Sequence, residues 1–117
     1  SYQMFVNIKS NGLWTVEFIS TVNRSGKGVL VFNDGRLLGG DEGYYYSGTY
    51  QINGSRIQGT VNVIRFDPTT ISVFGNIDQF ALSFSGEIND YHLTAAAGVA
   101  NNPQYKIRII GNKKEDM

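Results

Sequence analysis

Apolar and polar side chains alternate along most of this chain with a period of two residues. The clearest case is residues 44–52, whose apolar face carries Tyr44, Tyr46, Tyr50 and Ile52. Such alternation is typical of a β-strand that buries one face. Gly48 falls on the same face, where a residue without a side chain lets another backbone approach closely. This tyrosine-rich stretch is therefore expected to be a central strand.

The same alternation predicts seven more strands, and no stretch has a persuasive helical period. Their expected ranges are 13–20, 28–32, 36–41, 56–66, 78–86 and 91–99, with a last strand that buries Tyr105, Ile107 and Ile109. Asp34-Gly35 and Asn53-Gly54 separate neighbouring strands. These pairs tolerate positive φ and are strong signals for tight hairpin turns.

Eight strands joined in sequence by short turns predict an all-β fold. The expected architecture is an antiparallel up-and-down barrel of the lipocalin-like kind, because closure removes the free edges of a long sheet. A seven- or eight-stranded sandwich is the alternative. Residues 1–117 are expected to form one domain, with a lead-in at 1–11 and a frayed, flexible tail at 112–117. Within the lead-in, residues 4–9 are expected to cover the fold or to serve as an interface arm.

Charge and rare residue types exclude several classes of function. Ten basic and ten acidic side chains cancel, so nucleic-acid binding is not expected. Cysteine is absent, no apolar run reaches the roughly 20 residues of a membrane span, and the single histidine, His92, falls on an outward face. A zinc site or a catalytic triad needs more such groups. We therefore expect no enzyme activity, no cofactor and no metal.

The inward face of the expected barrel gathers large aromatic and very small residues. A barrel of about eight strands is either filled by its own side chains or holds one small ligand, and both remain open from the sequence. In the second case tyrosine hydroxyls would orient an apolar ligand. The candidate cavity residues are Trp14, Phe18, Tyr44, Tyr46, Gly48, Tyr50, Gly59, Phe80, Phe84, Ala95 and Tyr105.

Four segments of the chain, at residues 12–20, 26–29, 35–41 and 44–48, resemble the GrlR family. The most specific part is Gly39-Gly40-Asp41 followed by the tyrosine-rich strand. This family comprises lipocalin-like negative regulators of type III secretion genes in enteric bacteria, with uncharacterised relatives. The resemblance implies a cytoplasmic homodimeric barrel that binds a transcriptional activator and does not contact DNA itself.

The chain departs from that family at the turn after the tyrosine-rich strand. The enteric regulator has an exposed acidic run there, which is tied to its activator contact, whereas residues 51–56 here contain no acid. A different protein partner, or a plain carrier of a small apolar ligand, is the alternative. Outward apolar residues such as Ile19 and Ile110 also favour a homodimer. The candidate partner-surface residues are Asp41, Glu42, Asn53, Gly54 and Arg56.

Overall fold

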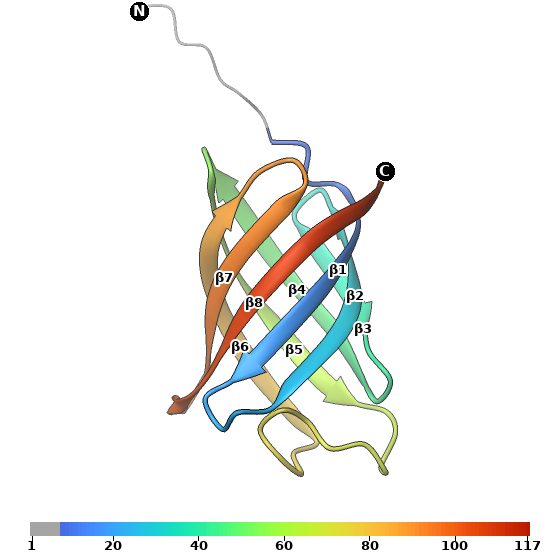
Figure 1. The fold of residues 1–117 in the computed structure, drawn as a ribbon, viewed down its shortest axis with the longest axis vertical. Helices are drawn as coiled ribbons and strands as arrows, with labels where there is room; N and C mark the ends of the chain where they lie inside the picture. Colours follow the sequence, from blue (N-terminus) through green and yellow to red (C-terminus); the bar gives the residue numbers. More distant parts are fainter. Residues whose placement is uncertain (1–7) are drawn as a thin grey trace, which may run out of the picture.

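The computed structural model describes residues 8–117, which form a closed barrel of eight antiparallel strands (Figure 1). Each strand pairs with the next in sequence, and the last pairs with the first. This result confirms the predicted up-and-down barrel and excludes the sandwich. The strands are β1 (Gly12–Ser20), β2 (Ser25–Asn33), β3 (Arg36–Gly40), β4 (Tyr44–Asn53), β5 (Arg56–Arg65), β6 (Gln79–Ile88), β7 (His92–Val99) and β8 (Asn102–Asp116).

Strand β8 closes the barrel by pairing with β1 along the whole length of β1. The register runs from Ser20 opposite Ile107 to Gly12 opposite Asp116. The prediction of a flexible tail at 112–117 is therefore wrong for residues 112–116. Without those residues the first part of β1 would expose unpaired backbone groups on one edge, so pairing outweighs the polar, charged composition that suggested fraying.

The two predicted hairpin turns are present, with different geometries. In the β2–β3 turn Asp34 and Gly35 have φ of 48° and 88°, the pattern of a type I′ turn. Asn53 pairs with Arg56, so the central residues of the β4–β5 turn are Gly54 and Ser55. Gly54 has φ of 62°, as expected where glycine comes first in a two-residue turn.

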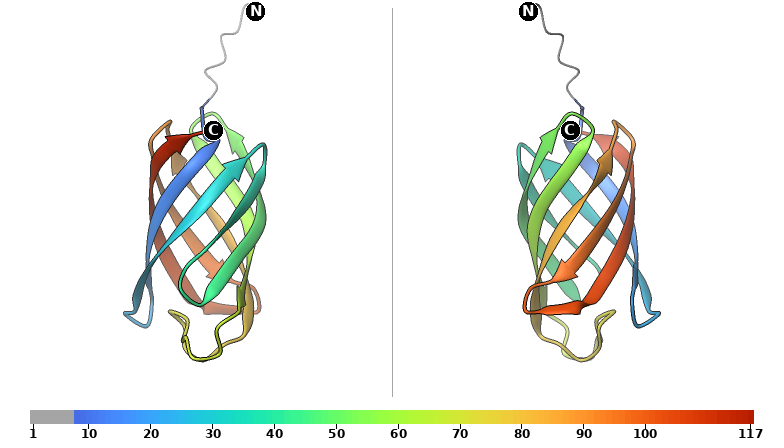
Figure 2. Two further views of the ribbon diagram at one scale, coloured as in Figure 1. Left: turned by 90° about the vertical axis from the view of Figure 1, so that its right-hand side faces the viewer. Right: turned by 90° about the vertical axis from the view of Figure 1, so that its left-hand side faces the viewer.

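The two ends of the barrel differ (Figures 1 and 2). The end that carries residues 8–11 and the C-terminus is blocked from within and is called the closed end here. Trp14 and Phe32 pack there with ring centroids 5.6 Å apart, and Phe32 and Tyr50 with centroids 4.5 Å apart. The Trp14 indole donates a hydrogen bond to the carbonyl of Ser10 at 2.8 Å.

Part of the lead-in acts as the predicted cover. Ile8 packs against the core, and the Asn11 amide group exchanges hydrogen bonds of 2.8 and 2.9 Å with Asp34 in the β2–β3 turn. Residues 4–7 of the predicted cover segment lie outside the described residues.

The predicted alternation between inward and outward faces is present in β4. Tyr44, Tyr46 and Tyr50 are buried, and Tyr45 between them is exposed. Gly48 is needed because a Cβ at this position would meet the carbonyl oxygen of Thr60 and would lie 2.8 Å from the Cα of Val61.

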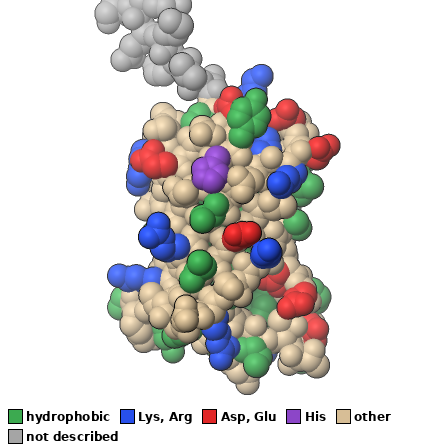
Figure 3. All heavy atoms as spheres, in the orientation of Figure 1, with side chains coloured by type: hydrophobic (Ala, Val, Ile, Leu, Met, Phe, Trp, Pro, Cys, Tyr) green, Lys and Arg blue, Asp and Glu red, His purple; other side chains and the backbone are tan. Residues whose placement is uncertain are grey.

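One face of the barrel mixes charges of both signs. On the face that carries β7, β8 and β1, acidic and basic side chains are interspersed with single apolar ones (Figure 3). This face shows no basic stripe of the kind that typifies nucleic-acid binders. Residues 8–117 include no helix that is long and apolar enough to cross a membrane.

Replacing Gly48 by valine should lower the free energy of unfolding by about 1–3 kcal/mol, because the side chain would press on the β5 backbone. Urea denaturation followed by tryptophan fluorescence measures this. Gly98→Val is the matched control, since a Cβ at Gly98 would have no atom within 4 Å. Equal stability of the two variants would contradict the placement of β4.

Candidate ligand cavity

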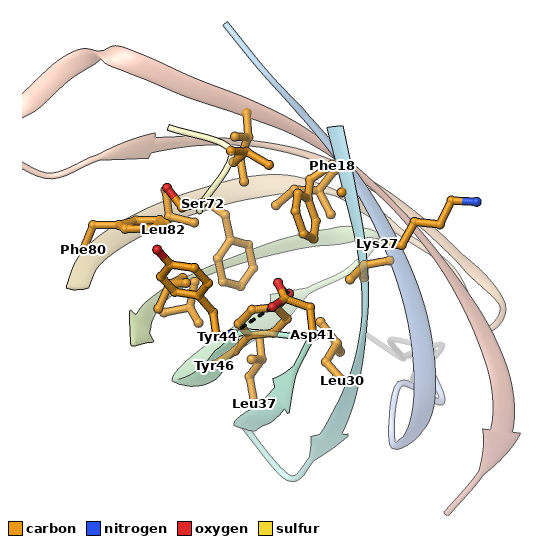
Figure 4. A pocket seen from close by; sticks show the side chains of 18 of the residues that line it. Phe18, Lys27, Leu30, Leu37, Asp41, Tyr44, Tyr46, Ser72, Phe80 and Leu82 are labelled. Atoms are coloured by element: carbon orange, nitrogen blue, oxygen red, sulfur yellow. Dashed lines mark hydrogen bonds between the residues drawn. The ribbon is translucent and has the colours of Figure 1, made fainter. Parts of the chain in front are cut away.

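The interior of the barrel is incompletely filled and contains a cavity of about 400 Å³ (Figure 4). All eight strands contribute to its wall, and most of the lining side chains are apolar. The aliphatic part includes Leu30, Leu37, Val61, Val63, Leu82 and Ile107. The volume falls within the range of small-molecule sites in proteins, about 300–1,000 Å³.

Six of the eleven candidate cavity residues line this space, and five do not. The six are Phe18, Tyr44, Tyr46, Phe80, Phe84 and Ala95. Trp14 and Tyr50 belong to the aromatic plug of the closed end. Gly48 and Gly59 lie against the backbones of neighbouring strands, and Tyr105 stacks on Phe74 with ring centroids 5.3 Å apart.

The cavity opens at the end opposite the termini, called the open end here. Its rim includes the exposed residues Lys27, Glu42 and Ile71, so the cavity reaches solvent there. Residues 66–78, which join β5 to β6 and are called the mouth loop, lie across this end (Figure 2).

Phe74 anchors the mouth loop to the barrel. Its ring is 7% exposed and packs edge-on against Phe80 at 5.4 Å and flat against Tyr105 at 5.3 Å. The Ser20 hydroxyl donates to the carbonyl of Val73 at 2.9 Å, which ties the loop to the end of β1.

Arg65 holds the other side of the mouth loop. Its guanidinium donates to the carbonyl of Thr70 at 3.0 Å, to Asn76 at 2.7 Å and to Asp78 at 2.5 Å. These contacts order the loop without filling the cavity beneath it.

One acidic side chain enters the cavity wall. Asp41 follows β3, and its Oδ1 atom accepts hydrogen bonds from the backbone N–H groups of Gly43 at 3.0 Å and Tyr44 at 2.9 Å. Its Oδ2 atom accepts a hydrogen bond of 2.5 Å from the Tyr46 hydroxyl (Figure 4). Asp41 was expected at a partner surface. The structure places it half-buried on the cavity wall, because the tight β3–β4 turn folds its carboxylate back onto the following strand.

The pKa of Tyr46 is raised far above its ordinary value of 10.0. Burial of the phenol is the largest cause, followed by its hydrogen bond to Asp41 and the negative charge of that carboxylate. The phenol therefore stays protonated and keeps donating to Asp41 over the whole physiological pH range.

The other partner-surface candidates do not form one surface with Asp41. Glu42 is exposed at the open end, whereas Asn53, Gly54 and Arg56 are exposed at the β4–β5 turn of the closed end. Arg56 is engaged by Glu87 at 2.7 Å, and this hydrogen bond is the main reason that the pKa of Glu87 is lowered.

From the sequence, residues 71–76 are expected to be a loop with apolar anchors, and the structure confirms this, since Ser72 and Phe74 are buried within the mouth loop. The sequence did not indicate that this loop lies across the open end of the barrel or that Asp41 points inward. Within residues 8–117 no group of three or more His, Cys, Asp or Glu side chains gathers in a metal-binding arrangement.

Comparison with protein-family models gives no match for this chain, and comparison with curated proteins gives none either. The GrlR resemblance therefore rests on the sequence segments alone.

Replacing Tyr46 by phenylalanine should lower the free energy of unfolding at pH 7 by about 1.5–3 kcal/mol, because a hydrogen bond to a carboxylate is lost. The variant should also lose part of the alkaline pH dependence. Above pH 10 the unfolded chain releases the Tyr46 proton while the folded chain keeps it, so this group lowers stability by about 1.4 kcal/mol per pH unit. Urea titrations between pH 8 and 11 measure both effects, and identical pH slopes for the two proteins would refute the assignment.

Proposed function

We propose that the protein binds a small, largely apolar molecule inside the barrel and is not an enzyme. The supporting observation is the cavity of about 400 Å³, bounded by aliphatic and aromatic side chains and open at one end. An apolar ligand that buries about 200 Å² of its surface there would gain on the order of 5 kcal/mol from transfer out of water. Filling the void would add dispersion contacts that the empty wall lacks.

The polar side chains of the cavity are better suited to orienting a ligand than to catalysing a reaction. Acid–base catalysis commonly pairs groups in different protonation states across the reacting atoms. Here Asp41 and Tyr46 bond to each other, and the phenol is held protonated. This arrangement supports a role in holding a ligand at the mouth of the barrel.

Replacing Ala95 by leucine should weaken binding of an apolar probe at least about tenfold, because the larger side chain occupies the space the probe needs. The folded state should be no less stable, since the new atoms enter a void. N-phenyl-1-naphthylamine, whose fluorescence rises in apolar surroundings, serves as the probe, with thermal melts as the stability check.

Ala96→Leu is the control, because Ala96 is exposed on the outside of the same strand. It should bind the probe like the original protein. Probe binding that survives Ala95→Leu unchanged, or no binding to the original protein, would argue against an internal site.

The second candidate function is that of a cytoplasmic GrlR-like regulator, which acts as a homodimer that sequesters a transcriptional activator. Besides the sequence resemblance, an outward apolar strip on β2, β3 and β4 supports it. The strip consists of Val29, Leu38 and Tyr45, which are 48%, 48% and 45% exposed. Leu38 lies opposite Val31, the next outward residue of β2 after Val29, and only the side-chain-free Gly40 separates Val29 from Tyr45 in the register, so the three residues are close neighbours on the outer face.

A second copy of this chain is the occupant we propose for the strip. The three side chains are uncharged and the formal net charge of the protein is zero, so two copies meet without long-range repulsion. Contiguous exposed apolar residues of this kind mark association surfaces more often than isolated ones do.

Replacing Leu38 by aspartate should convert a dimer into a monomer, because each partner would then have to bury an unpaired charge. Light scattering after size-exclusion chromatography at about 100 μM measures the mass. Ser85→Asp, which places the same charge on the exposed outer face of β6, should leave the dimer intact. If the unsubstituted protein is a monomer at this concentration, the proposed homodimer is wrong.

A further inference from the structure

Five side-chain hydroxyls line the cavity, and four of them donate a hydrogen bond to a protein acceptor; the fifth, Ser25, is exposed at the rim. The Tyr44 hydroxyl donates to the carbonyl of Ile77 at 2.5 Å, and the Ser72 hydroxyl donates to the carbonyl of Gly75 at 2.8 Å. The Tyr46 hydroxyl donates to Asp41 at 2.5 Å. Each hydroxyl has only one proton, so what these groups can still offer a ligand is an acceptor lone pair.

Asp41 adds a negative charge to this set of acceptors. Its carboxylate has room for about four hydrogen bonds and receives three, from Gly43, Tyr44 and Tyr46. The ion pairs found among residues 8–117 join Lys27 to Glu17, Arg56 to Glu87, Arg65 to Asp78 and Lys113 to Asp116. Asp41 belongs to none of them, so its charge on the cavity wall is balanced only by hydrogen-bond donors.

Lys27, the basic side chain among the described residues that line the cavity, does not neutralise Asp41. The Lys27 side chain is 82% exposed, lies 3.7 Å from Glu17, and extends away from the cavity (Figure 4). Glu42 adds a second carboxylate at the rim. Arg24 and Arg65 at the same end donate to the carbonyls of Ser72 and Thr70 in the mouth loop. The side chains that line the cavity therefore offer mainly acceptors and negative charge to a ligand.

We propose that the ligand is a small apolar amine, with its ammonium group hydrogen-bonded to Asp41 at the rim and its hydrocarbon part in the aliphatic interior. This inference rests on the proposed internal ligand site and specifies its chemistry. A cationic donor gains a charge-assisted hydrogen bond from Asp41, whereas the carboxylate of a fatty acid is repelled by Asp41 and Glu42. An alcohol of equal length donates a hydrogen bond but carries no charge, so its affinity should lie between those of the amine and the fatty acid.

Isothermal titration calorimetry at pH 7 with octylamine, octan-1-ol and octanoate tests the proposal, because the three probes share one chain and differ only in the head group. Octylamine should bind about tenfold more tightly than octanol, and octanoate should bind most weakly. Asp41→Asn should reduce octylamine affinity about tenfold and change octanol affinity less than about threefold.

Glu115→Gln is the matched control, since it removes one exposed carboxylate from β8 near the closed end. It should leave the order of the three probes unchanged. The ranking on the unsubstituted protein tests the idea independently of whether Asp41→Asn folds. Equal affinities, or octanoate binding as tightly as octylamine, overturn the amine preference and leave the internal site standing. Absence of binding by all three probes overturns both.

Discussion

The pairing of β8 with β1 is the constraint on which the rest of this structure depends. It continues from Gly12 to Ser20 and gives every strand a neighbour on both sides. Once the sheet is closed, the period-two alternation of each strand separates an inside from an outside. An open sheet with the same sequence would leave two edges unpaired and would have no enclosed interior.

The cavity follows from how side-chain volume is distributed inside that closed sheet. Aromatic rings gather at both ends, with Trp14 and Phe32 at the closed end and Phe74 stacked on Tyr105 under the mouth loop. Between them the wall is largely aliphatic and includes the small residue Ala95. Eight strands enclose space for one layer of large side chains or for one small ligand, and the aliphatic middle leaves the second option open.

Much of this fold could be predicted from the sequence because strand alternation and hairpin turns are local signals. The buried tyrosines of β4 and the Asp34-Gly35 turn are examples. The extension of β8 to Asp116 could not be predicted, because its polar, charged last residues are ordered by pairing with β1 at the other end of the chain. The inward direction of the Asp41 side chain could not be predicted either, because it depends on the conformation of the three-residue connection between β3 and β4. Whether the barrel interior is a cavity or a packed core depends on side-chain rotamers, which the sequence pattern does not give.

The central claim is that the interior holds an apolar void, which is blocked by aromatic rings at the closed end and opens beneath the mouth loop. Crystals of the protein pressurised with xenon test it directly, because xenon enters dry apolar cavities and scatters strongly. The account predicts xenon inside the barrel, in contact with Val61, Leu82 and Ile107. An interior without xenon, filled by the protein's own side chains, would contradict it.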